Sequence, residues 1–235
     1  MTVDHEGFEM SMNEQRERAR NARVDVDSMQ VQNEVLANLK QASTFIYDCL
    51  EAKGSVSAIV VDGQETTVAS EGQEALVILS ETPFYAEMGG QIADTGIIES
   101  DTFKAVVKDV QKAPNGQPLH TVVVESGEMN VGDEVTARVD REKRTLILKN
   151  HTATHLMHRA LKDVLGDHVA QAGSYVGPDR LRFDFSHFGP ATKEELAQVE
   201  RAVNEKIWED IEVVIQEMDI DSAKAMGAMA LFGEK

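Results

Sequence analysis

Short runs of β-forming residues between Ser43 and Val139 predict β-strands separated by turns. Turn-forming residues such as Asp62-Gly63 and Pro114-Asn115-Gly116 separate the strands. Short strands at this spacing are typical of a small antiparallel barrel or sandwich. The predicted strands are Val56–Val61, Ala75–Leu79, Phe103–Val110, Thr121–Val124 and Val135–Val139.

The hydrophobic spacing changes after Arg144 and predicts a long amphipathic helix over Leu146–Leu165, with Gly166 as its natural end. Two strands are predicted next, Val169–Val176 and Arg180–Ser186. The second strand alternates apolar and polar side chains, so one of its faces should be buried. The expected inner face of the helix consists of Leu148, Ala153, Leu156, Met157, Ala160, Leu161 and Val164.

Both ends of the chain are also predicted to contain helices. Thr192 and Glu195 have the spacing of a capping box at the start of a helix. The predicted elements outside the central region are a charged helix over residues 4–23, a short helix from Asn33 to about Gln41, a strand over Val213–Met218 and a helix over Asp221–Ala230. These elements predict an α+β protein with a helical linker (1–42), a β-barrel domain (43–142) and an α+β domain (143–235).

The overall charge argues against nucleic acid as a partner, but one window differs. The chain of 235 residues has a net charge of −18. Between Arg141 and His187, eight Lys and Arg stand against five acidic residues, a net of +3, so the rest carries −21. Phosphate contacts need Lys and Arg, and this window alone is weak evidence for RNA.

Three features of the sequence indicate a cytoplasmic protein. No apolar run approaches the roughly 18 residues that span a bilayer. The N-terminal segment MTVDHEGFEM is acidic and has no apolar centre, so no secretory signal is predicted. Cys49 is the only cysteine, which excludes an internal disulfide and favours a reducing compartment.

His151 and His155 are the strongest candidates for chemistry. Histidines at i and i+4 lie on one face of a helix, where neutral imidazoles can share a zinc ion. His158 falls in the same sector, and the Glu of an H-E-x-x-H protease is absent. Two histidines do not complete a zinc site, so half-buried histidines on an amphipathic helix are the alternative interpretation.

A glycine-rich segment, Pro83–Gly96, is the second candidate. Gly89, Gly90 and Gly96 permit backbone conformations that other residues avoid. The Lys and Ser/Thr of a phosphate-binding loop are missing. The spacing alone favours a tight turn of the barrel over a binding loop.

The third candidate is the pair of predicted strands that follows the histidine helix. Gln171 enters the first strand, and Arg180 and Arg182 lie on the second. A charged strand face in this position could line a cleft or could face water, and the sequence does not decide between the two.

Together these segments resemble the alanyl-tRNA synthetase family over nearly the whole chain. The resemblance lies in EGFEMSMNEQRERAR (Glu6–Arg20), PFYAEMGGQIADTG (Pro83–Gly96), KNHTATHLMHRAL (Lys149–Leu161), HVAQAGSYVGPDRLRFDFSH (His168–His187) and the terminal ALFGEK. It implies a β-barrel followed by an editing domain of the kind found in threonyl-tRNA synthetase. By this resemblance, the editing domain of this chain is expected to hydrolyse Ser-tRNA(Ala) and Gly-tRNA(Ala).

The resemblance also implies roles for individual residues. His151 and His155 match the first two of four zinc ligands, and the other two, in a C-x-x-x-H motif, are expected beyond Lys235. Thr154 matches the residue expected to bond the serine hydroxyl. Gln171 matches the strand glutamine expected to position water or substrate.

The expected substrate is the acceptor end of tRNA(Ala), with Gly89, Gly90 and Gln91 in the substrate-binding loop. Arg180 and Arg182 are expected to meet acceptor-end phosphates. The family usually has Ser and Gly where this loop has Met88 and Ala93, so no polar role is expected for residue 88. ATP and Mg²⁺ are implied only for the aminoacylation domain, whose motifs are not in this sequence, and the remaining domains of the synthetase are implied partners.

The resemblance therefore implies part of a synthetase of this family, an alanine–tRNA ligase, that contains its editing region and is not expected to aminoacylate by itself. One alternative is a tRNA-binding or interdomain module without hydrolytic activity. Another is a metal-dependent hydrolase of small esters, which depends only on the spacing of His151 and His155. Aminoacyl-tRNA and small-ester substrates would separate these functions.

Overall fold

Strands with alternating buried and exposed side chains form an antiparallel barrel, as predicted. The computed structural model describes residues 7, 10, 12, 35–214, 216 and 218–227. The strands of this first region are β1 (Thr44–Phe45), β2 (Glu51–Val61), β3 (Gln64–Thr66), β4 (Val68–Ser70), β5 (Glu74–Leu79), β6 (Glu81–Thr82), β7 (Gly96–Glu99), β8 (Phe103–Lys112), β9 (Pro118–Asn130) and β10 (Glu134–Val139).

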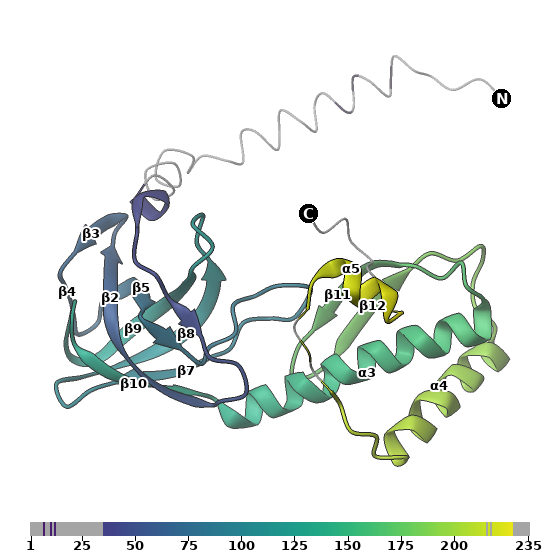
Figure 1. Ribbon diagram of the computed structural model, residues 1–235. Coiled ribbons are helices and arrows are strands. Elements are labelled where there is room, and N and C mark those ends of the chain that lie inside the picture. The colour runs from purple at the N-terminus through teal and green to yellow at the C-terminus, as the bar shows by residue number, and fades with distance from the viewer. Residues whose placement is uncertain are drawn as a thin grey trace. The chain divides into compact units, whose positions relative to one another are not determined.

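The barrel closes because β10, the strand at one end of the sheet, also pairs with β2 near the other end (Figure 1). Antiparallel ladders join β2 to β5, β5 to β9, β9 to β8 and β8 to β7. β10 neighbours β7 on one side and pairs antiparallel with β2 on the other. The short strands β3 and β4 extend β2 and β9, and β1 pairs in parallel with β6. Closure leaves no free edge on the six strands of the ring.

The period-2 pattern fills the interior of the barrel with apolar side chains. On β8, the side chains of Phe103, Ala105, Val107 and Val110 are buried. Two register shifts against β9 carry this alternation past irregular positions of β8. Residues 35–38 are helical, and Leu36 and Leu39 pack with Ile78 in the same apolar cluster.

The second region combines three helices with a two-stranded antiparallel sheet. Its elements are α3 (Arg141–Leu165), β11 (Gln171–Val176), β12 (Leu181–Phe185), α4 (Lys193–Trp208) and α5 (Ile220–Ala225). Leu161 of α3 and Val199 of α4 are buried in one cluster, against which Phe183 and Phe185 of β12 pack. Figure 1 shows α3 against this sheet and α4 beside α3.

The described residues fall into two compact units: a barrel unit, made of those up to 84 and of 96–138, and a helical unit, made of 85–95 and those from 139 onward. Residues 85–95 of the glycine-rich segment therefore belong to the helical unit, and the prediction of this loop as a barrel turn is wrong. Gly96, at the end of the segment, begins β7 of the barrel. Gln91 forms a parallel bridge with Val176, and the Ile92 N–H donates to the Val176 carbonyl at 3.1 Å. The three-domain division of the chain stays a prediction.

The predicted strands of the barrel and the predicted end of α3 at Gly166 are confirmed. α3 begins five residues earlier than predicted, because Asp140 caps a first turn that has few apolar residues to signal it. Leu148, expected on the inner face, is 49 % exposed. The capping box of Thr192 and Glu195 is confirmed.

The predicted strand at Val213–Met218 is wrong at its described positions, which have no strand pairing. Val213 and Val214 are exposed there instead of packing on a sheet. The Asn33 cap, the end of the last predicted helix (228–230) and nearly all of the predicted helix 4–23 lie outside the described residues.

Candidate functional site

Helix α3 carries most of the candidate site and is fixed at several points. The Asp140 side chain accepts the Lys143 N–H at 3.0 Å and caps the N-terminus. Gly166, with φ of 113°, ends the helix. In the middle, the Asn150 side-chain amide donates to the carbonyl of Gly177 at 2.8 Å. This last bond anchors α3 to the turn between β11 and β12.

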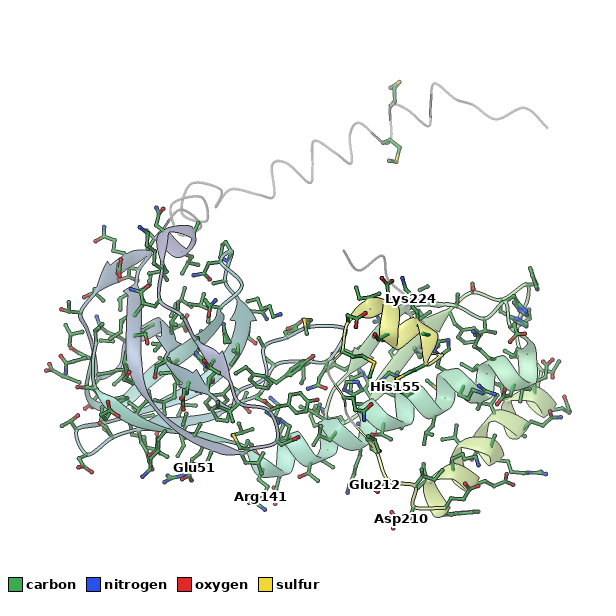
Figure 2. The ribbon with its side chains drawn as sticks, viewed as in Figure 1. Glu51, Arg141, His155, Asp210, Glu212 and Lys224 are labelled. Atoms are coloured by element: carbon green, nitrogen blue, oxygen red, sulfur yellow. The ribbon has the colours of Figure 1, made fainter. Side chains whose placement is uncertain are left out.

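His151 and His155 lie one turn apart on α3, as their spacing predicts. Their ring centroids are 5.1 Å apart and the ring planes are inclined by 21°, so the imidazoles are stacked. Figure 2 labels His155 on the helix. His155 is exposed, His151 is half-buried, and His158, one turn further along, is buried. The helix thus presents two adjacent imidazoles, one of them open to solvent.

The glycine-rich loop brings a third polar group to this pair. The Nδ1 atom of His151 lies 2.6 Å from Oε1 of Gln91. Gln91 is only 4 % exposed, and its backbone is held by the bridge to Val176 on β11. The loop and the helix therefore meet at a hydrogen bond between residues 60 positions apart in sequence.

Gly90 allows the loop to approach β11 closely. Its φ is +88°, and a Cβ at this position would collide with Oγ of Ser174 and lie 2.7 Å from the Ser174 carbonyl oxygen. The Ser174 hydroxyl donates to the Gly89 carbonyl at 3.2 Å. Gly89 also has a positive φ of +63°, but a Cβ there would meet no atom within 4 Å. Of these two glycines, only Gly90 is required by the space available.

An ion pair that the sequence analysis did not single out also fixes the loop to the helix. The Nε atom of Arg144 lies 2.8 Å from Oδ1 and 3.0 Å from Oδ2 of Asp94, and the Arg144 Nη2 atom contacts Oδ2 as well. The Tyr85 N–H donates to the same carboxylate at 2.7 Å. Asp94 is 1 % exposed. The two residues were visible as part of the glycine-rich motif and the basic window, but nothing in the sequence pairs them.

Thr154 precedes His155 on α3 and is 7 % exposed. Its hydroxyl donates to the Asn150 carbonyl at 2.8 Å, the bond to residue i−4 that threonine often makes in helices. The oxygen keeps lone pairs that can accept a hydrogen bond. Thr154 can therefore act toward a ligand as an acceptor.

The other predicted site residues lie on β11 and just before or within β12. Gln171 begins β11, opposite Phe185. The Arg180 guanidinium lies 5.6 Å from the centre of the Tyr175 ring, and Arg182 pairs with Asp184 at 3.1 Å, with both side chains largely exposed. The charged strand face therefore faces water. Within the described residues, no hydrogen bond, ion pair or ring contact joins Gln171, Arg180 or Arg182 to the histidine pair.

Burial lowers the pKa of both His151 and His158, which favours their neutral form. Burial, and then the neighbouring His155, lower the pKa of His151. Burial, then the charge of Lys162, lower the pKa of His158, against a hydrogen bond with the Val169 backbone that raises it. Neutral imidazole is the form that binds metal ions.

His151 and His155 fit zinc as two of its ligands, because they are adjacent and His151 bonds an acceptor through its Nδ1. In the part of the chain that the structure describes, no group of three or more His, Cys, Asp or Glu side chains is arranged to hold a metal ion. No helix in that part is long and apolar enough to cross a membrane.

Comparison with known proteins gives consistent results along the chain. A model of the family "tRNA synthetases class II (A)" matches residues 1–143. The chain is 76 % identical over 236 aligned residues to an alanine–tRNA ligase of Lysinibacillus sphaericus. It is 61 % identical to that of Geobacillus thermodenitrificans and 59 % identical to that of Listeria innocua.

Each of these alignments covers 100 % of this chain but only 26 or 27 % of the relative. The chain thus spans about a quarter of the length of the curated relatives it matches. Since the family model covers more than half of its residues, the chain belongs to the class II (A) tRNA synthetases.

Proposed function

We propose that the helical unit of this chain is part of a site that hydrolyses wrongly charged tRNA(Ala), with Ser-tRNA(Ala) and Gly-tRNA(Ala) as substrates. The observation that carries the proposal is the stacked pair of His151 and His155, of which His151 is hydrogen-bonded to Gln91 of the glycine-rich loop. Paired imidazoles are suited to a hydrolytic metal site.

The complete protein that contains this chain is proposed to be an alanine–tRNA ligase, as its relatives are named. ATP and Mg²⁺ would then act in aminoacylation, in another part of that protein. Its remaining domains and the acceptor end of tRNA(Ala) would be the partners of this chain. Hydrolysis at a second site is useful to such an enzyme, because a synthetic site excludes smaller or similar amino acids poorly.

His151 and His155 would hold a zinc ion, which supplies a Lewis acid that orients and polarises the bound ester. Thr154 would accept a hydrogen bond from the serine hydroxyl, which alanine lacks. The geometry of Thr154 supports this role. Its hydroxyl proton is donated to the Asn150 carbonyl, and the lone pairs of its oxygen remain available to accept a hydrogen bond. A polar group left unpaired by the wrong ligand costs about 1–3 kcal/mol.

The surrounding residues would hold the substrate. Gln171 would position the attacking water or the amino acid. Gly89, Gly90 and Gln91 would let the backbone of the loop approach the terminal ribose. Arg180 and Arg182 would contact the acceptor-end phosphates, supported by their exposure.

The discriminating role of Thr154 is tested by Thr154→Val in the complete protein. Valine keeps the shape of the side chain and removes the acceptor. We expect the ratio of Ser-tRNA(Ala) to Ala-tRNA(Ala) hydrolysis to fall by roughly tenfold or more, in line with the removal of one hydrogen bond. Thr145→Val is the matched control, because Thr145 is exposed on the same helix and its hydroxyl makes the same kind of bond, to the Arg141 carbonyl at 2.7 Å. An unchanged ratio in Thr154→Val would reject the role.

The hydrolytic function itself is tested by His151→Ala in the complete protein. Loss of Ser-tRNA(Ala) deacylation, with aminoacylation retained, is the expected result. Undiminished deacylation would favour the alternative of a tRNA-binding module. Equal activity on small esters and aminoacyl-tRNA would favour a general metal-dependent esterase.

A further inference from the structure

Gln91 is held in a single position by the backbone around it. The Gln91 N–H donates to the Met88 carbonyl at 3.1 Å, and the Met88 N–H donates to the Gln91 carbonyl at 3.3 Å. On either side, the Val176 N–H donates to the Gly90 carbonyl at 2.8 Å, and the Ile92 N–H donates to the Val176 carbonyl at 3.1 Å. The residue is almost fully buried, so its side chain has one direction available, toward α3.

The contact made by this side chain determines which nitrogen of His151 carries the proton. An amide oxygen only accepts hydrogen bonds, and Oε1 of Gln91 lies 2.6 Å from Nδ1 of His151. Nδ1 must therefore carry the proton. A neutral imidazole has one N–H, so Nε2 has the free lone pair.

We propose that Gln91 is a positioning residue that holds His151 in the Nδ1–H tautomer and presents Nε2 as its only lone pair. The stack of His151 on His155 limits rotation of the ring, but stacking does not distinguish the two nitrogens. The hydrogen bond to Gln91 distinguishes them, because Oε1 accepts only from the nitrogen that carries the proton. The consequence for metal binding rests on the proposed function, whereas the tautomer does not.

The chemistry of the amide suits this task. A neutral acceptor fixes the proton on Nδ1 without adding a negative charge beside the ring. Partners of this kind orient metal-binding histidines and make their free nitrogen a better ligand. Gly90 contributes indirectly, because only a residue without Cβ lets the loop lie this close to Ser174.

The tautomer can be measured in the chain with ¹⁵N-labelled histidine, by long-range ¹H–¹⁵N correlation at about pH 8, where ordinary imidazoles are neutral. His151→Asn identifies the His151 signals. We expect the Nδ1–H pattern in the wild type and a shift toward Nε2–H in Gln91→Met. Gln91→Glu keeps an acceptor and should restore the wild-type pattern, which a merely structural role would not predict.

Gln73→Met is the matched control, because Gln73 also accepts a hydrogen bond through Oε1, from the Ser70 N–H at 2.7 Å, but in the barrel unit. It should leave the His151 signals unchanged. Unchanged amide resonances of Ile92 and Val176 show whether the loop keeps its place in each variant. The proposal is overturned if His151 of the wild type carries its proton on Nε2, or if Gln91→Met leaves the tautomer unaltered.

A second measurement separates this proposal from the proposed function. Titration of the complete protein with Zn²⁺ alone should show roughly 10–100-fold weaker binding in Gln91→Met, as for other residues that orient metal ligands. If Gln91 controls the tautomer but deacylation does not depend on His151, the proposed function fails and the positioning role stands. If deacylation depends on His151 but the tautomer does not depend on Gln91, the reverse holds.

Discussion

At the scale of single residues, Gly89 and Gly90 show two different reasons why a position requires glycine: a positive φ, and lack of space for a Cβ. Gly89 and Gly90 both have positive φ, which costs roughly 1–2 kcal/mol for a residue with a Cβ. Only Gly90 also lies against the backbone of another strand. Substitutions at the two positions therefore measure backbone strain alone and strain with a steric clash.

Gly90→Ala is expected to destabilise the loop more than Gly89→Ala does. The new methyl group must displace the Ser174 carbonyl or the loop, and the hydrogen bonds of Val176 with Ile92 and Gly90 should weaken with it. Native-state hydrogen exchange of the Ile92 and Val176 amides measures this. Gly89→Ala, the control, should cost about 1 kcal/mol from backbone strain alone. Equal effects of the two substitutions would contradict the close approach at Gly90.

His120 should make the stability of the barrel unit depend on pH. Its Nε2 lies 2.8 Å from Oγ1 of Thr82, its Nδ1 lies 2.9 Å from the Val77 carbonyl oxygen, and burial lowers its pKa from 6.5 to about 4. Between these two pH values the unfolded chain binds the proton and the folded chain does not. Folding stability is therefore intact above pH 6.5 and falls as the pH drops toward 4.

The measurement is the free energy of unfolding of wild type minus that of His120→Leu, by urea denaturation at several pH values. The leucine variant lacks the titrating group, so other ionisable groups cancel in the difference. The difference should shrink below pH 6.5 by up to about 1.4 kcal/mol per pH unit. A difference that does not vary with pH would contradict the buried neutral histidine.

At the scale of elements, the sequence pattern predicts those helices and strands whose position depends on neighbouring residues in the chain. Alternation along β8 predicts its buried face, and Gly166 predicts the end of α3. The start of α3 escapes prediction because a charged first turn after Asp140 has no apolar periodicity. The Val213–Met218 segment has strand propensity, but a strand also needs a partner, which the sequence does not supply.

The contacts of the candidate site are likewise of two kinds: those predictable from local sequence spacing and those that depend on the tertiary fold. The pairing of His151 and His155 follows from helical spacing alone. The contact of His151 with Gln91 does not, because it depends on a loop 60 residues earlier pairing with β11. The ion pair of Asp94 and Arg144 is likewise a tertiary contact across 50 residues.

Removing only one partner of the Asp94–Arg144 pair should weaken the attachment of the loop to the helix strongly. Arg144 is nearly buried, so Asp94→Asn removes the carboxylate charge beside a desolvated cation, at a cost of about 3–5 kcal/mol. Adding Arg144→Met should recover much of this loss. The unit contains the helices α3 and α4, so loss of helical circular dichroism during urea denaturation measures its stability.

The control for this cycle is the exposed pair of Arg138 and Glu51 in the barrel, with side chains 44 and 53 % exposed. Solvent screens such pairs, so Arg138→Met should cost less than about 1 kcal/mol. A similar cost for Asp94→Asn would show that the loop is not held by its charge.

At the scale of the whole molecule, charge limits how this chain can meet RNA. A net charge of −18 repels phosphate over long distances, so any contact must be local. The exposed basic side chains near the candidate site include Arg180 and Arg182. A site with few cations should bind tRNA with a shallow dependence on salt.

Replacing both arginines by glutamine in the complete protein is therefore expected to weaken tRNA(Ala) binding and to lower its salt dependence. The slope of log K against log salt should fall by roughly 1 for each phosphate that the protein no longer neutralises. Ser-tRNA(Ala) and Ala-tRNA(Ala) should be affected equally, because phosphates carry no information about the amino acid. Arg138→Gln, which removes a cation already paired with Glu51 and Glu99, is the control and should leave the slope unchanged. A slope that is the same with and without Arg180 and Arg182 would place the path of the acceptor end on other residues.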